Sequence, residues 1–160
     1  MIIKNHYPIP LIIEIMNRIK DAKRFIKLDI HDIFNHIYIM EENEYKTIFH
    51  TRYDHFEYLI MLFDLCNIFT IFQSYINDAL HEFLDEFCII YLDNILIYID
   101  DSLEDHINYI YQILQYLLDN DLFVKFEKCE FHIQEIKFLG FIISLDDIVM
   151  NPNRIIIIVD

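Results

Sequence analysis

The feature that most constrains this chain is the segment of residues 87–101, FCIIYLDNILIYIDD, in which two apolar runs surround the polar pair Asp93 and Asn94. Both runs are rich in β-branched and aromatic residues, so they predict two paired strands. Asp and Asn favour tight turns, and a hairpin turn alone would explain the pair. A second strand-like segment, residues 24–30, carries another carboxylate, Asp29, near its end. If the two segments lie side by side, Asp29 and Asp93 meet at one edge of a sheet.

Two carboxylates at one sheet edge would suit a metal-dependent reaction. Carboxylate oxygens are the ligands that Mg²⁺ prefers in proteins. A pair of such ions can stabilise both the attacking and the leaving oxygen of a phosphoryl transfer. The polar pair therefore predicts either a plain turn or a phosphoryl-transfer site.

Several motifs resemble one family, in the same order along the chain. YLDN resembles the YxDD box of reverse transcriptases, and KLDI resembles the strand that carries their first catalytic aspartate. The likeness continues through YPIPLIIEIMNRI, KLDIHDIFNHI, YKTIFHTRYDHFEYLIMLFDLCN, TIFQSYINDAL, YLDNILIYIDD, LEDHINYIYQILQYLLDNDLFVKFEKCEF and EIKFLGFIIS. Because they share order and spacing over nearly all of the 160 residues, the chain resembles the palm of the polymerase of a gypsy-type long-terminal-repeat retrotransposon.

The order of the predicted elements gives the fold class. Apolar residues at helical spacing predict helices over residues 11–23, 67–84 and 103–120. The stripe of the first helix is Leu11, Ile12, Ile15, Met16 and Ile19, and that of the second is Phe69, Phe72, Ile76, Leu80 and Phe83. Residues 46–51 and 56–61 predict a hairpin. With the strands described above and further strands near the end, this order favours an α+β fold. The resemblance implies a polymerase palm-like antiparallel sheet with helices packed on one face, partial fingers and no thumb. Residues 1–160 would form a single reverse transcriptase palm domain, incomplete at both ends relative to the family.

The resemblance also implies an activity, that of an RNA-directed DNA polymerase domain of a retrotransposon polyprotein. Such a domain extends a primer by two-metal nucleotidyl transfer. Asp29 and Asp93 would hold Mg²⁺ or Mn²⁺, and Asn94 stands at a catalytic position of the family. The expected partners are an RNA or DNA template-primer and deoxynucleoside triphosphates.

Further site residues follow from the same resemblance. Phe34 stands where reverse transcriptases carry the aromatic ring that blocks a ribose 2′-hydroxyl, and the amide of Gln73 would lie near the incoming nucleotide. Tyr91 of the YLDN box is a third candidate for substrate contact. Lys128 is nominated to protonate the pyrophosphate leaving group, with Lys125 as the competing candidate. Without the resemblance, Phe34 would be a core residue, Gln73 a surface residue and the two lysines surface charges.

Several features depart from the family pattern. Asn94 replaces the second aspartate of the box, so the cluster loses one of three negative charges and the rate should fall on the order of 10²–10³-fold. The chain has 12 basic and 27 acidic residues, a net charge of −15, and no Lys or Arg between Arg52 and Lys125. A protein that binds a phosphate backbone usually needs a basic surface. Asp64 and Phe69 also replace a glycine and a proline of the helix-entry motif.

These departures leave two alternatives open beside the polymerase. The first is a catalytically dead remnant of the same domain. The second is an acidic α+β protein-interaction module that keeps the sheet as a scaffold. Binding of a protein partner that does not depend on Asp29 or Asp93 would favour the interaction module.

The sequence also bears on location. No apolar run reaches the roughly 18 residues that a membrane-spanning helix needs. The opening residues MIIKNHYPIP lack the apolar centre of a signal peptide. We therefore expect an intracellular protein without a membrane span.

Overall fold

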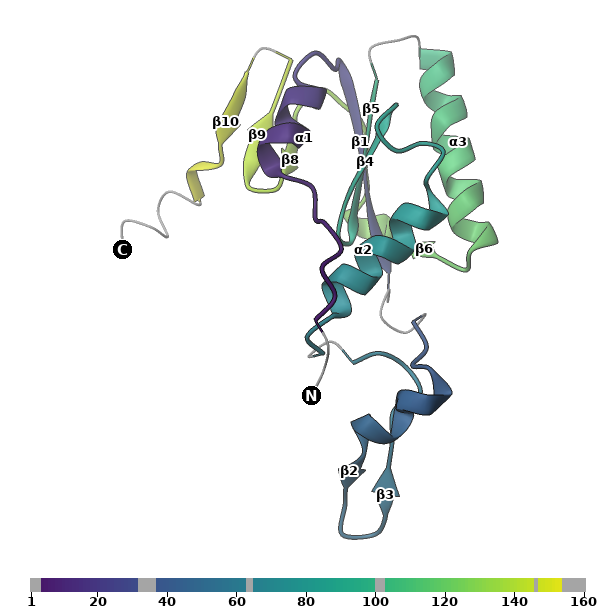
Figure 1. Cartoon of the computed structure of the whole chain (residues 1–160). Helices are drawn as coiled ribbons and strands as arrows, with labels where there is room; N and C mark the ends of the chain where they lie inside the picture. Colours follow the sequence, from purple (N-terminus) through teal and green to yellow (C-terminus); the bar gives the residue numbers. More distant parts are fainter. Residues whose placement is uncertain (1–3, 32–36, 63–64, 100–102, 146, 154–160) are drawn as a thin grey trace.

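The fold is arranged around one antiparallel sheet (Figure 1). The computed structural model describes residues 4–31, 37–62, 65–99, 103–145 and 147–153. The strands of the sheet are β1 (Arg24–His31), β4 (Cys88–Tyr91), β5 (Asn94–Ile99), β6 (Phe123–Val124) and β7 (Glu130–Ile133). Their order is β4-β5-β1-β6, and β7 also pairs with β1. Strand β1 is therefore the centre of the sheet. It pairs with β5 in unbroken register from Arg24 to Asp29.

Both faces of the sheet are buried, because successive side chains of a strand point to opposite faces. In β1, Ile26 and Leu28 belong to one core cluster, whereas Phe25 belongs to another. The helices that cover these faces in the described residues are α1 (Ile12–Ile19), α2 (Ile68–Ala79) and α3 (Leu103–Asp119). Apolar residues of α2 and α3 share the cluster of Ile26, so these two helices lie on one face.

Helix α1 lies on the opposite face, and here the prediction that the helices pack on one face was wrong. Ile15 and Ile19 lie one turn apart on α1, are buried, and share a core cluster with Phe25. Figure 1 shows α1 and strands β8 (Ile136–Phe138), β9 (Phe141–Ile143) and β10 (Ile148–Met150) on one side of the sheet, with α3 on the other. Helical spacing predicted the buried stripe of α1, but it could not say which face of the sheet that stripe would cover.

Strands β8, β9 and β10 form a small antiparallel sheet of their own. The turn between β8 and β9 consists of Leu139 and Gly140, both with positive φ, at 50° and 85°. Two-residue hairpin turns with positive φ at both positions favour glycine, because glycine has no Cβ to clash. Gly140, the one glycine of the chain, stands at such a position.

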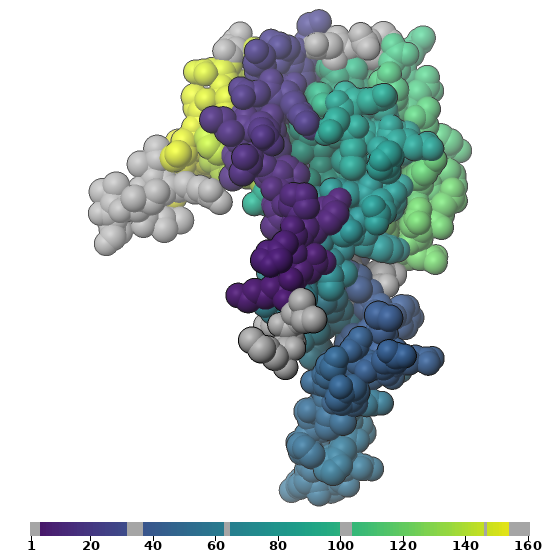
Figure 2. Space-filling view, viewed as in Figure 1, coloured from purple at the N-terminus to yellow at the C-terminus, as the bar shows by residue number. Residues whose placement is uncertain are grey.

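A narrow hairpin projects from the rest of the molecule (Figures 1 and 2). It contains the 3₁₀-helix η2 (Glu41–Thr47) and strands β2 (Phe49–His50) and β3 (His55–Phe56). The sequence predicted a hairpin here with strands over residues 46–51 and 56–61, and both strands are shorter than predicted. Strand β2 is shorter because η2 includes residues 46 and 47. Stacked rings stabilise it, with centroids 5.8 Å apart for Phe49 and Phe56.

The α+β class with antiparallel sheets is confirmed. Paired strands on either side of the Asp93 turn were predicted, and β4 and β5 are those strands. The third predicted helix, near residues 103–120, is α3. Among the residues that the structure describes, no helix has the length and apolar character needed to cross a lipid bilayer.

Candidate functional site

The register between β1 and β5 brings the predicted acidic positions together. Asp29 lies directly opposite Asn94, and the backbone N–H of Ile30 donates a hydrogen bond of 3.0 Å to the carbonyl oxygen of Asp93. Side chains of directly opposed residues in an antiparallel pair lie on the same face. The side chains of Asp29 and Asn94 therefore share a face, and the backbone of Asp93 lies beside β1 where that strand passes the turn between β4 and β5.

Asp29 is nearly buried and has a basic neighbour. Its exposed fraction is 9%, and the Nζ atom of Lys128 lies 3.5 Å from its Oδ2 atom. Lys128 ends the 3₁₀-helix η3 (Phe126–Lys128), and this helix is held against β1 by a 2.7 Å hydrogen bond from the backbone N–H of Lys125 to the carbonyl oxygen of Asp29. Of the two candidate lysines, Lys128 places its ammonium group at the carboxylate, and Lys125 contributes its backbone.

Cys129 follows η3 and adds to this local packing. Its Sγ atom lies 3.3 Å from the carbonyl oxygen of Lys125, to which the thiol donates. Partial burial raises the pKa of the Cys129 thiol above its usual value; a backbone hydrogen bond at Asp29 opposes this rise, and the charge of the Asp29 carboxylate adds to it. The thiol is therefore neutral at ordinary pH, and it adds no negative charge to the site.

Asp93 is exposed, and its carboxylate is hydrogen-bonded to the side chain of Asn94. The amide nitrogen Nδ2 of Asn94 donates a 2.7 Å hydrogen bond to Oδ1 of Asp93. Asp93 follows Leu92, which has a φ of 53° in the left-handed region. An aspartate in place of Asn94 would have no N–H to offer and would instead add a second negative charge beside Asp93.

Gln73 lies beneath this turn and is fully buried, with an exposed fraction of 0%. Its Oε1 atom accepts a 2.9 Å hydrogen bond from the backbone N–H of Leu92, and its Nε2 atom donates to the carbonyl oxygen of Ile90 at 3.2 Å. The alternative that Gln73 is a surface residue is therefore wrong. Sequence reasoning missed its contact with the turn; the signal was its place beside the buried stripe of α2.

Two other candidate residues have different positions. Tyr91 is half-buried, pairs with Asn94 across the hairpin and packs against the core cluster of Phe25. Phe34 lies outside the described residues. The roles of Tyr91 and Phe34 toward a substrate stay predictions.

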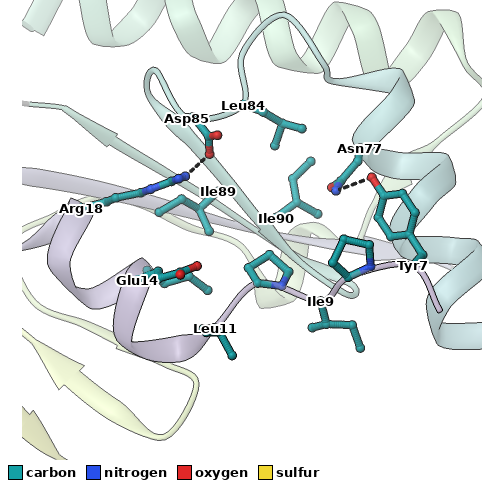
Figure 3. Close-up of a pocket in the computed structure, with 13 residues that line it drawn as sticks. Tyr7, Ile9, Leu11, Glu14, Arg18, Asn77, Leu84, Asp85, Ile89 and Ile90 are labelled. Atoms are coloured by element: carbon teal, nitrogen blue, oxygen red, sulfur yellow. Dashed lines mark hydrogen bonds and ion pairs between the residues drawn. The ribbon is translucent and has the colours of Figure 1, made fainter.

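A pocket of about 450 Å³ lies beside α1, α2 and β4 and is drawn in Figure 3. Its walls include Ile89 and Ile90 of β4 and the proline-rich segment that precedes α1. Arg18 and Asp85, which form an ion pair, also line it. Neither Asp29 nor Asp93 lines this pocket, so it is separate from the acidic site.

The donor set at the acidic site fits a hard divalent cation. No group of three or more His, Cys, Asp or Glu side chains suited to a metal occurs among the described residues. Two carboxylates are nevertheless the usual protein contribution to a Mg²⁺ site that is completed by substrate phosphates and water. Asp29 and Asp93 are the two carboxylates of this site, and their binding of a metal stays a prediction.

Sequence comparison confirms the family. The family model described as reverse transcriptase (RNA-dependent DNA polymerase) matches residues 1–143. The chain belongs to the reverse transcriptase family. It is 38% identical over 153 residues to the retrovirus-related Pol polyprotein from transposon 297 of Drosophila melanogaster, and 31% identical to that from transposon gypsy of the same organism. These matches cover 96% of this chain but 14% and 15% of the two polyproteins.

A third relative and the solved structures agree. The chain is 34% identical over 140 residues to the transposon Tf2-7 polyprotein of Schizosaccharomyces pombe, covering 88% of the chain and 10% of that protein. The fold is similar to a foamy viral protease-reverse transcriptase in complex with RNA/DNA hybrid, with a TM-score of 0.82 and 17% identity over 94% of this chain and 20% of that one. The chain therefore spans a small part of the length of each of these proteins.

Proposed function

We propose that this chain is the palm of an RNA-directed DNA polymerase and that residues 1–160 act as a single domain of a retrotransposon polyprotein. The observation that carries this proposal is the register of β1 with β5, which sets Asp29 opposite Asn94 and beside Asp93 in a member of the reverse transcriptase family. The proposed partners are a template-primer of RNA or DNA and deoxynucleoside triphosphates. In support, similar folds were solved with an RNA/DNA hybrid and with double-stranded DNA.

The proposed chemistry is transfer of a nucleotide to the primer end. The 3′-hydroxyl of the primer loses its proton to water, its oxygen forms a bond to the α-phosphorus of the incoming nucleotide, and the bond from that phosphorus to the bridging oxygen breaks to release pyrophosphate. Mg²⁺ or Mn²⁺, when bound, would stabilise the attacking and the leaving oxygen. Asp29 and Asp93 would hold the metal, and Phe34 and Tyr91 would contact the substrate.

Lys128 is the proposed proton donor to the leaving pyrophosphate. Its side chain is 57% exposed while its Nζ atom stays within reach of Asp29. An ammonium group on an exposed side chain can turn from the carboxylate toward a phosphate without burying a charge. Proton donation to a leaving group typically contributes 10²–10⁴-fold to a rate.

A primer-extension assay with Mg²⁺ or Mn²⁺ tests the proposal. We expect weak extension by the natural sequence and an increase on the order of 10²-fold or more in Asn94→Asp, because the substitution removes the amide donor from Asp93 and restores a negative charge. Adding Asp29→Ala to that variant should abolish the product. Asp119→Ala, an exposed aspartate at the end of α3, is the matched control and should leave extension unchanged.

A catalytically dead remnant is the second candidate, and a specific observation favours it. The Asn94 amide bonds the Asp93 carboxylate, which a metal would need, and the chain carries a net charge of −15. If Asn94→Asp gives no product with either metal, the remnant is the better description and the polymerase proposal fails.

A further inference from the structure

The side chain of Gln73 is a polar group in an apolar environment. Its neighbours on α2, Phe72 and Ile76, have exposed fractions of 1% and 0%. A buried amide lowers stability unless its donors and acceptor are used. Here Nε2 donates to Asn77 Oδ1 at 2.9 Å and to the Ile90 carbonyl oxygen, and Oε1 accepts from the Leu92 N–H. Both N–H donors of the amide are therefore engaged within the protein.

These bonds hold the turn that carries Asp93. Ile90 and Leu92 lie on the two sides of Tyr91, so Gln73 contacts the backbone at both ends of a three-residue stretch. Leu92 has a positive φ of 53°, a conformation that residues with a Cβ adopt only when the surroundings favour it. The hydrogen bond that the Leu92 N–H donates to Gln73 is a contact of this kind. It holds the backbone at the residue directly before Asp93.

A neighbouring asparagine fixes the orientation of the Gln73 amide. Asn77 lies one helical turn further along α2, and its Oδ1 can accept only from the nitrogen end of the amide. The oxygen end is thereby directed to Leu92. Asn77 in turn donates to the hydroxyl oxygen of Tyr7 at 3.0 Å, a contact that Figure 3 shows beside the pocket.

We propose that Gln73 is a positioning residue for Asp93: it holds the Leu92 backbone so that Asp93 stays in the turn beside β1. The proposal rests on the proposed function for the role of Asp93 as a metal ligand. It differs from the nucleotide contact that the family resemblance implies, because the amide donors face the turn and Asn77.

Gln73→Met is the decisive variant, because methionine keeps a similar length and has no N–H or carbonyl group. We would measure amide hydrogen exchange by NMR on the whole chain, together with Mn²⁺ binding by electron paramagnetic resonance. We expect the Leu92 amide to exchange at least 10-fold faster, the amides of Ile26 and Ile97 in the sheet to be unchanged, and Mn²⁺ affinity to fall several-fold. Gln115→Met, at an exposed glutamine bonded within α3, is the matched control.

A second variant separates positioning from simple packing. Gln73→Glu retains an oxygen that can accept from Leu92, so it should keep more of the Leu92 protection than Gln73→Met at the pH where its carboxyl is neutral. Unchanged protection of Leu92 in Gln73→Met, or an equal loss of protection throughout the sheet, would overturn the proposal. If the natural sequence binds no Mn²⁺, the proposed function fails, and the exchange rates of Leu92 still decide whether Gln73 holds the turn.

Discussion

The replacement His106→Leu tests a buried histidine far from the acidic site. His106 lies on α3 with an exposed fraction of 0%, and neither of its ring nitrogens has a hydrogen-bond partner. The ring of His132 on β7 lies beside it, with centroids 4.8 Å apart. Burial, together with smaller contributions from the nearby His132 and Arg24, lowers the pKa of His106 to about 4.

The pKa difference sets how stability depends on pH. Because the pKa of His106 is lower in the folded chain than the ordinary 6.5, the unfolded chain binds the proton first as the pH falls. This histidine therefore lowers the free energy of unfolding progressively as the pH falls through 6.5 and then through about 4, and the change levels off about one pH unit below that. At 1.36 kcal/mol for each unit of pKa, the loss is about 2 kcal/mol between pH 7 and pH 5 and about 3 kcal/mol by pH 4.

Urea denaturation at pH 7 and pH 5 measures this effect. The free energy of unfolding of His106→Leu, relative to the natural sequence, should rise by about 2 kcal/mol as the pH is lowered from 7 to 5. At pH 7 the variant should be no less stable, because it removes two buried nitrogens without partners. His81→Leu, at an exposed histidine, controls for general effects of charge. Equal pH dependence in His106→Leu and the natural sequence would refute the reasoning.

Two further predictions concern the site and the core. In the Asn94→Asp background, Lys128→Met should lower primer extension at least 10-fold, because the Lys128 ammonium group lies at the Asp29 carboxylate. Lys125→Met should lower it much less. Equal losses in extension assays would argue against a proton donor at Lys128. Phe72→Ala should lower the free energy of unfolding by about 3–5 kcal/mol in urea denaturation, since Phe72 is 1% exposed. Phe69→Ala, at a 42% exposed residue of the same helix, should cost far less, and similar costs would contradict the burial.

Local patterns predicted most of the elements of this fold. The apolar runs around Asp93 specified β4 and β5, and helical spacing specified α1, α2 and α3. The stripe proposed for α2 was largely right, because Phe72 and Ile76 are buried, but Phe69 is exposed. These successes share one cause, which is that each depended on the periodicity of neighbouring residues.

Periodicity could not predict the contacts between segments that are distant in the sequence. The meeting of Asp29 and Asp93 was reached by supposing that two strands pair, and the register that sets Asp29 opposite Asn94 is fixed by packing across 65 residues of sequence. The sequence likewise gave no reason to place the Gln73 amide against Leu92, since that contact requires α2 and the turn to be positioned first. Family resemblance filled part of this gap for the acidic residues, but not for Gln73.

The projecting hairpin bears on how the molecule unfolds locally. None of residues 37–62 is buried, so β2 and β3 add nothing to the two core clusters. A two-stranded ribbon held by a few stacked rings is marginally stable by itself. We therefore expect the hairpin to unfold and refold as a separate cooperative unit, without changing the free energy that holds the central sheet together.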